Sequence, residues 1–153
     1  MNDSLYDARE ELKRADHLIF VSLKYTRTCD VLQHVIERLS NSIGFMFQAL
    51  LEDLKEKGSI EEVPAAPIPR AKLVKEQFSG DELLEKFADL FMKMRKISKA
   101  DFSRECEFRR HVTLTTMVDD SIVKVDIDIV TAWYKEIKEL FEYVEKRVES
   151  PEE

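Results

Sequence analysis

The residues most able to do chemistry form a basic cluster late in the chain. Four of them lie within eight positions of one another, namely Arg104, Arg109, Arg110 and His111. Residues 93–111 carry seven basic and three acidic side chains, a local charge of +4, whereas the 153-residue chain has a net charge of −7. Guanidinium groups match the oxygens of a phosphate, and imidazole exchanges protons near neutral pH. The cluster therefore predicts a site for a phosphate-bearing ligand.

These residue types predict distinct roles. His111 would act as a general base on a ribose 2′-hydroxyl or as an acid on the leaving oxygen, and Arg104 would hold the phosphate and stabilise its developing charge. These two are the candidate catalytic residues. The candidate phosphate-binding residues are Arg109, Arg110 and Arg27. In the alternative, structural interpretation, His111 caps the C-terminus of a helix and the arginines pair with surface carboxylates.

Arg104 and His111 are separated by six residues, and Arg27 and His34 show the same spacing. We favour the first pair because it lies in the basic cluster. Through this R-x6-H motif, its size and its helical pattern, the chain resembles the HEPN superfamily. The resemblance implies a small helical bundle that dimerises. It also implies a metal-independent endoribonuclease, or a nucleotide-binding relative, in which the arginines and histidines of two subunits meet at a composite cleft. Glu105 stands where the family often has a small polar residue.

The surroundings of Arg104 discriminate between two functions. One is the RNA-directed role just described. If Glu105 and Glu107 pair with Arg104, no phosphate site is left, and the chain would be a non-catalytic helical interaction module. Its partner would then be a second copy of the chain or another small protein. Residues 44–51 and 84–94 carry more large apolar side chains than one narrow stripe buries, so we expect a homodimer.

Three potential metal ligands share one predicted helix face: Asp30, His34 and Glu37. Metal sites in helical bundles also need ligands from a facing helix, and neither His17 nor His111 stands in a typical ligand spacing. We therefore interpret this face as solvated and predict no metal and no cofactor.

A polar patch, Tyr25 with Arg27 and Thr28, lies between two apolar runs. It is either a helix junction whose side chains satisfy broken backbone hydrogen bonds, or Lys24 and Arg27 belong to the same anion site as Arg104. The sequence leaves both interpretations open.

The location of the protein is expected to be the cytoplasm. Cys29 and Cys106 form no CxxC pair and no disulfide framework. No apolar window approaches the roughly 20 residues of a membrane span, and the polar N-terminus is unlike a signal peptide. We therefore expect no membrane partner.

Three glycines and four prolines in 153 residues favour long helices. We predict an all-α fold, a four- to five-helix bundle with long antiparallel helices, as a single domain over residues 1–150 with a frayed tail over 151–153. Asp3 or Ser4 is expected to cap the first helix. A second helix is predicted from Thr28 to Lys57, stopped by Gly58. Whether the two helices join through residues 23–28 is left open.

The second half of the chain is expected to continue the bundle after a proline-rich connector over residues 58–69. Predicted next are a short helix over 69–78, a helix opened by a Ser79–Glu82 capping box, and a helix opened by a Ser98–Asp101 box. The last of these would carry Phe102, Cys106 and Arg109.

Residues 112–118 are rich in β-branched side chains and are followed, after two aspartates, by a similar run over 121–127. They form either a small hairpin or an extended crossover. Asp126 or Asp128 is then expected to cap the last helix.

Overall fold

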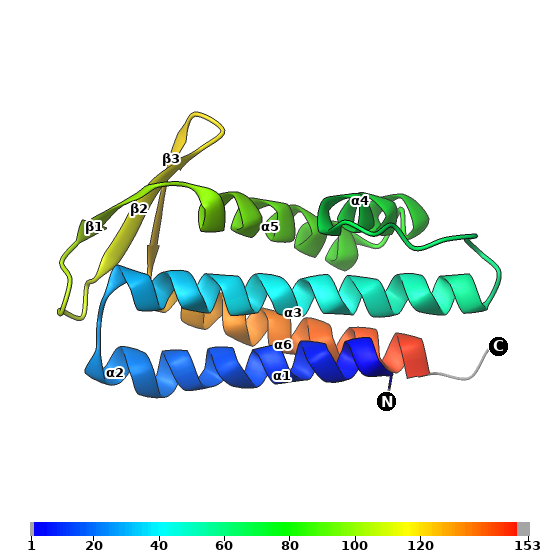
Figure 1. The fold of residues 1–153 in the computed structure, drawn as a ribbon, viewed down its shortest axis with the longest axis horizontal. Coiled ribbons are helices and arrows are strands. Elements are labelled where there is room, and N and C mark those ends of the chain that lie inside the picture. Colours follow the sequence, from blue (N-terminus) through cyan, green and yellow to red (C-terminus); the bar gives the residue numbers. More distant parts are fainter. Residues whose placement is uncertain (1, 150–153) are drawn as a thin grey trace.

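The computed structural model describes residues 2–149 and is mostly helical, with one small sheet. Its elements in chain order are α1 (Asp3–His17), the π-helical turn η1 (Leu18–Ser22), α2 (Leu23–Tyr25), α3 (Cys29–Glu56), α4 (Pro67–Gln77), α5 (Glu82–Lys99), β1 (Phe102–Glu105), β2 (Thr113–Val118), β3 (Ser121–Asp126) and α6 (Ile127–Glu149). The predicted helical bundle is confirmed, and the sheet is an addition to it (Figure 1). The tail predicted over 151–153 lies outside the described residues.

The first two long helices form an antiparallel pair. The side chain of Asn2 caps α1 by accepting a hydrogen bond from the Leu5 N–H at 2.8 Å, so the cap predicted at Asp3 or Ser4 is wrong by one or two positions. At Thr26 the backbone becomes extended, and the Thr28 hydroxyl caps α3 by accepting from the Val31 N–H at 3.3 Å. The two helices therefore do not join, because residues 26–28 turn the chain.

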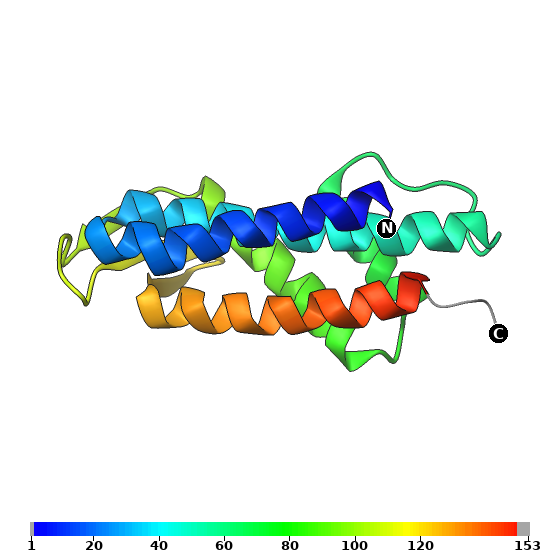
Figure 2. The same cartoon turned by 90° about the horizontal axis from the view of Figure 1, so that it is seen from below.

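Helix α3 is the central element of the bundle. Figure 1 shows α1 on one side of it and α4 and α5 on the other. Figure 2 shows α6 beside α1, with α5 running obliquely behind them. The side chains of α3 that face these neighbours are fully or almost fully buried, including Leu32, Val35, Ile36, Leu39, Ile43, Met46, Phe47 and Leu50. Burial of this stripe provides much of the hydrophobic stabilisation of the fold.

A close contact fixes α5 against α3. The rings of Phe47 and Phe91 pack edge to face with centroids 5.9 Å apart. A Cβ at Gly44 would lie 3.3 Å from the Phe91 ring, so the absence of a side chain there lets α5 approach.

The start of α4 and the cap of α5 differ from those predicted. Helix α4 begins at Pro67, two residues earlier than expected, and ends at Gln77. The cap of α5 is Asp81, whose carboxylate accepts from the Leu84 N–H at 3.1 Å, and not Ser79. The aspartate directly before the first residue of the helix outcompetes the serine two positions earlier.

The helix predicted from the Ser98–Asp101 box is wrong. The Ala100 N–H donates to the carbonyls of Lys96 and Ile97, so Ser98 lies inside the last turn of α5. The chain is extended from Ala100, and residues 102–105 pair with residues 113–116 as strand β1. Pairing with a distant strand overrides the local capping pattern, which contains no information about that partner.

The segment after residue 112 forms a hairpin and not a crossover. The three strands are antiparallel in the order β1-β2-β3, and β2 and β3 are joined by a two-residue turn. Both turn residues, Asp119 and Asp120, have positive φ (50° and 66°), as a type I′ turn requires. Asp126 then caps α6 by accepting from the Ile129 N–H at 2.9 Å, which selects Asp126 from the two predicted caps.

Among residues 2–149, no helix is long and apolar enough to cross a membrane.

Candidate functional site

Two segments that are far apart in the sequence meet at one end of the molecule. They are the α2–α3 junction, residues 24–28, and the β1–β2 loop with the end of β1, residues 104–111 (Figure 1). The Phe108 N–H donates to the Arg27 carbonyl at 2.6 Å. We call these two segments together the aromatic–cationic end. All five residues predicted for the site lie in it, since Arg27 is now adjacent to the segment that holds the other four.

The loop is anchored to the N-terminus of α3. The Cys29 N–H donates to Oε2 of Glu107 at 2.9 Å, and the Cys29 thiol donates to the Thr113 carbonyl at 3.2 Å. A carboxylate is favoured at this position because the N-terminus of a helix carries partial positive charge. Burial raises the pKa of the Cys29 thiol, which keeps it protonated as a donor.

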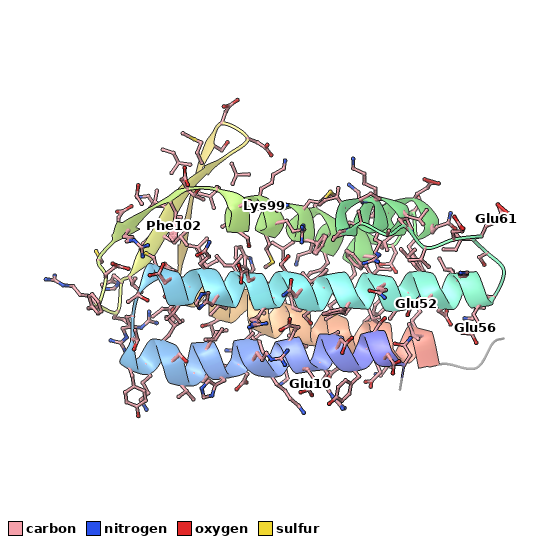
Figure 3. The ribbon with its side chains drawn as sticks, viewed as in Figure 1. Glu10, Glu52, Glu56, Glu61, Lys99 and Phe102 are labelled. Carbon is pink, nitrogen blue, oxygen red and sulfur yellow. The ribbon has the colours of Figure 1, made fainter. Side chains whose placement is uncertain are left out.

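Arg104 is held by two carboxylates. It projects from β1 and makes ion pairs with Asp30 at 3.1 Å and with Glu107 at 3.4 Å. Its guanidinium carbon also lies 4.9 Å from the centroid of the Phe102 ring. The hydrogen bond to Asp30 raises the pKa of the Arg104 guanidinium. Phe102 marks the start of β1 in Figure 3. Arg104 thus links the sheet to the start of α3.

Glu105, which follows Arg104, faces elsewhere. It accepts a hydrogen bond from the Thr115 hydroxyl and lies 3.9 Å from the ammonium group of Lys124. Of the two glutamates that sequence reasoning considered as partners of Arg104, only Glu107 pairs with it. Asp30 supplies the second carboxylate, which the sequence did not predict as a partner.

The other predicted residues differ in how far they are neutralised. Arg110 pairs with Asp128 at 2.7 Å, and Nε of Arg27 donates to the Leu23 carbonyl at 3.2 Å. Within residues 2–149, the exposed side chains of Arg109 and His111 make no hydrogen bond or ion pair. These two are therefore the groups most available to an anionic ligand.

His111 does not cap a helix. It lies in the turn that precedes β2, and its carbonyl accepts a hydrogen bond from the Thr113 hydroxyl at 2.8 Å. The structural interpretation of this residue as a C-terminal cap is wrong, because the helix predicted before it is strand β1 and a loop.

Two exposed aromatic side chains belong to the same end. The sequence placed Tyr25 in a polar patch and did not single out Phe108, and it predicted neither as an exposed aromatic surface. Phe108 is 74% exposed and Tyr25 is 79% exposed. Phe108 and Cys106 also have positive φ, 66° and 55°, a strained conformation for residues other than glycine. The signal for Phe108 was its position inside a charged run with no apolar periodicity, where no core contact is expected.

The basic run of residues 93–111 does not form one face. Lys96 pairs with Asp119 on the β2–β3 turn at 2.8 Å, whereas Arg95 and Lys99 line a pocket between α3 and α5. The local charge of the sequence is thus divided between two sides of α5 and the aromatic–cationic end.

The second R-x6-H pair, Arg27 and His34, and the three residues predicted to share a face of α3 do not gather at one site either. His34 and Glu37 line a groove between α1 and α3 together with His17, whereas Asp30 pairs with Arg104. Among residues 2–149, no three histidine, cysteine or acidic side chains are grouped so that they could hold a metal ion.

Comparisons of the chain with protein-family models, with curated protein sequences and with solved structures find no match in any of the three. The resemblance to the HEPN superfamily therefore rests on the motif, the size and the helical pattern, and it stays a prediction.

Proposed function

We propose that this protein binds single-stranded RNA at the aromatic–cationic end. The observation that carries the proposal is the exposure of Phe108 and Tyr25 on two segments joined by a hydrogen bond. A cationic side chain that forms no ion pair within the described residues follows or precedes each ring in the chain, Arg109 after Phe108 and Lys24 before Tyr25. An exposed aromatic ring offers a stacking surface for a base, and an unpaired arginine offers donors for a phosphate.

The charges of this end favour a short, single-stranded ligand. Lys24 and Arg109 form no ion pair within the described residues, and Arg27 hydrogen-bonds only to a carbonyl through its side chain, so its charge is not neutralised. Three cations are too few to hold a long duplex against a chain of net charge −7. Stacking on Phe108 and Tyr25 would supply the rest of the affinity, at about 1–3 kcal/mol per base.

In this proposal Arg104 positions the loop and does not contact a phosphate of the RNA. To hold a phosphate it would have to leave Asp30 and Glu107, and its charge is already balanced by them. Binding without cleavage is therefore the function that the geometry favours. Endoribonuclease activity by Arg104 and His111, as the HEPN resemblance implies, is the competing hypothesis.

The test is binding of a fluorescent single-stranded RNA of about 12 nucleotides, followed by fluorescence anisotropy in the presence of EDTA. Phe108→Ala and Tyr25→Ala should each weaken binding roughly 5- to 150-fold, the loss of one stacked base. Arg109→Ala should weaken it and lower the salt dependence by about 0.7 in the log–log slope. Tyr6→Ala, an exposed tyrosine near the opposite end of α1, is the matched control and should bind like the wild type.

Two results would contradict the proposal. One is wild-type protein that does not bind, or binds as tightly after Phe108→Ala and Tyr25→Ala. The other is RNA that is shortened by the wild type but not by His111→Ala, read on a gel from the same samples. That second outcome would establish the nuclease in place of simple binding.

A second candidate function is a non-catalytic interaction module that forms homodimers. It is favoured by three apolar side chains that are about half exposed on the first helix and its π-helical turn, namely Tyr6, Phe20 and Val21. Exposed apolar side chains on a helix that already packs its other face favour a further partner.

A further inference from the structure

We infer a second binding site, for a hydrogenphosphate ion, between α3 and α5. Within residues 2–149, four buried side-chain polar atoms have no hydrogen-bond partner in the protein. Three of them, Ser40 Oγ, Arg95 Nε and Ser98 Oγ, belong to residues that line one small pocket. Buried polar atoms are nearly always paired, so three unpaired atoms in one place indicate a ligand.

The pocket has a volume of about 220 Å³. Its lining comes from the middle of α3 and the last turns of α5, and consists of Glu37, Ser40, Asn41, Arg95, Ser98 and Lys99. Ser40 forms the inner part, since the residue is only 3% exposed, whereas Glu37 and Lys99 are exposed at the rim. Figure 3 shows Lys99 at the C-terminal end of α5. The space suits a small ion and excludes a nucleotide.

The hydrogen-bond donors that line the pocket favour an oxyanion as the ligand. Arg95 and Lys99 form no ion pair within the described residues, and the Arg95 guanidinium packs over the Phe91 ring at 5.8 Å. The buried Nε–H of Arg95 has no acceptor in the protein. An ion with several oxygens can accept from this N–H, from the Lys99 ammonium and from the two serine hydroxyls.

Glu37 adds selectivity among oxyanions. A carboxylate accepts hydrogen bonds, so it favours an oxyanion that carries a proton over one that does not. Hydrogenphosphate keeps one P–O–H at neutral and mildly alkaline pH, whereas sulfate and a fully ionised phosphate monoester have none. The pocket therefore fits free hydrogenphosphate better than either of these.

The experiment is thermal unfolding of the full chain in phosphate, in sulfate and in a small phosphate monoester at pH 8, at equal ionic strength. Phosphate should raise the melting temperature with a saturable dependence on its concentration, and the other two anions should raise it less. Arg109→Ala should keep the phosphate response, which separates this pocket from the aromatic–cationic end.

Two serines of α3 give a matched pair of variants. Ser40→Ala should abolish the phosphate response without lowering stability in the absence of phosphate, because its hydroxyl has no partner to lose. Ser42→Ala should lower stability and keep the response, because its buried hydroxyl donates to the Ala8 carbonyl at 2.9 Å. Lys99→Met should weaken the response.

A response that is equal in phosphate and sulfate, or that survives in Ser40→Ala and Lys99→Met, would overturn the inference. Absence of any saturable response would do the same, and the pocket would then hold only water.

Discussion

Glu107 connects the candidate site to the bundle at the scale of single residues. One of its carboxylate oxygens accepts a hydrogen bond from the Cys29 N–H and also forms an ion pair with Arg104. The same oxygen therefore satisfies an N–H at the start of α3 and helps to neutralise an arginine of β1. The neighbouring Phe108 is exposed to solvent. Much of the shape of the aromatic–cationic end depends on this one side chain.

We predict that Glu107→Ala lowers the free energy of unfolding by about 1 kcal/mol, as loss of a helix-capping acceptor does. Urea unfolding followed by circular dichroism measures this change. Glu105→Ala, which removes a carboxylate bonded at the surface of the sheet, is the matched control and should cost less. Equal effects would show that Glu107 has no special role at the helix start.

Sequence reasoning identified the basic residues of this end but not their pairing. The proposal that Arg27 belongs with the cluster of Arg104 was one of two open interpretations, and the structure brings the two segments together. The partners Asp30 and Asp128 could not be predicted, since each depends on how a loop folds back on a distant helix. The positive φ of Phe108 is likewise not indicated by any local pattern, although its position in a charged run without apolar periodicity agrees with its exposure.

At the scale of elements, a hydrogen bond ties the first helix to the last. The Tyr134 hydroxyl on α6 donates to the Asp16 carboxylate on α1 at 2.7 Å, and the ring packs edge to face with Phe20 at 5.9 Å. Burial, together with this hydrogen bond, raises the pKa of Tyr134 to about 12. The unfolded chain loses the proton near its ordinary value of about 10, before the folded protein does.

Because the unfolded chain loses the Tyr134 proton at lower pH than the folded protein does, the stability falls as the pH rises. The stability contributed by the Tyr134 hydroxyl is complete below about pH 10 and is lost as the pH rises through about 12. Tyr134→Phe should therefore be less stable than the wild type by about 1 kcal/mol at neutral pH, and the difference should shrink over that alkaline range. Urea unfolding at a series of pH values measures it.

The control is Tyr25→Phe, because the Tyr25 hydroxyl makes no hydrogen bond within the described residues. A stability difference for Tyr134→Phe that stays constant across the alkaline range would show that the hydroxyl does not titrate as the structure indicates.

Elements with strong periodicity were predictable, and elements defined by pairing were not. The apolar stripe of α3 and the stop at Gly58, whose φ is +81°, follow from local rules. Strand β1 does not follow from local rules, because residues 102–105 show no alternation of apolar and polar side chains that would distinguish them from the start of a helix. They become a strand only by pairing with β2.

At the scale of the whole molecule, a homodimer through the outer face of the first helix is the expectation to test. Sedimentation equilibrium should give twice the monomer mass, and Tyr6→Glu or Val21→Glu should reduce it to the monomer mass by placing a charge in the interface. Met117→Glu, at an exposed apolar position on the sheet, is the matched control and should remain dimeric. A monomeric wild type would contradict the expectation.

The bundle as a whole was the part of the prediction closest to the structure, because apolar periodicity specifies which faces are buried. The three-stranded sheet was only half expected, and it is this sheet that carries Arg104 and the loop of Phe108 to the end of the helices. The candidate site thus depends on the least predictable part of the fold.

The central claim is that single-stranded RNA binds where residues 24–28 meet residues 104–111. Backbone amide shifts of the isotope-labelled protein, recorded by NMR during titration with the RNA, test it most directly. We predict shifts concentrated in those two segments, with the residues around Tyr6 in α1 unchanged. Shifts confined to the residues around Tyr6, or no shifts at all, would contradict the claim.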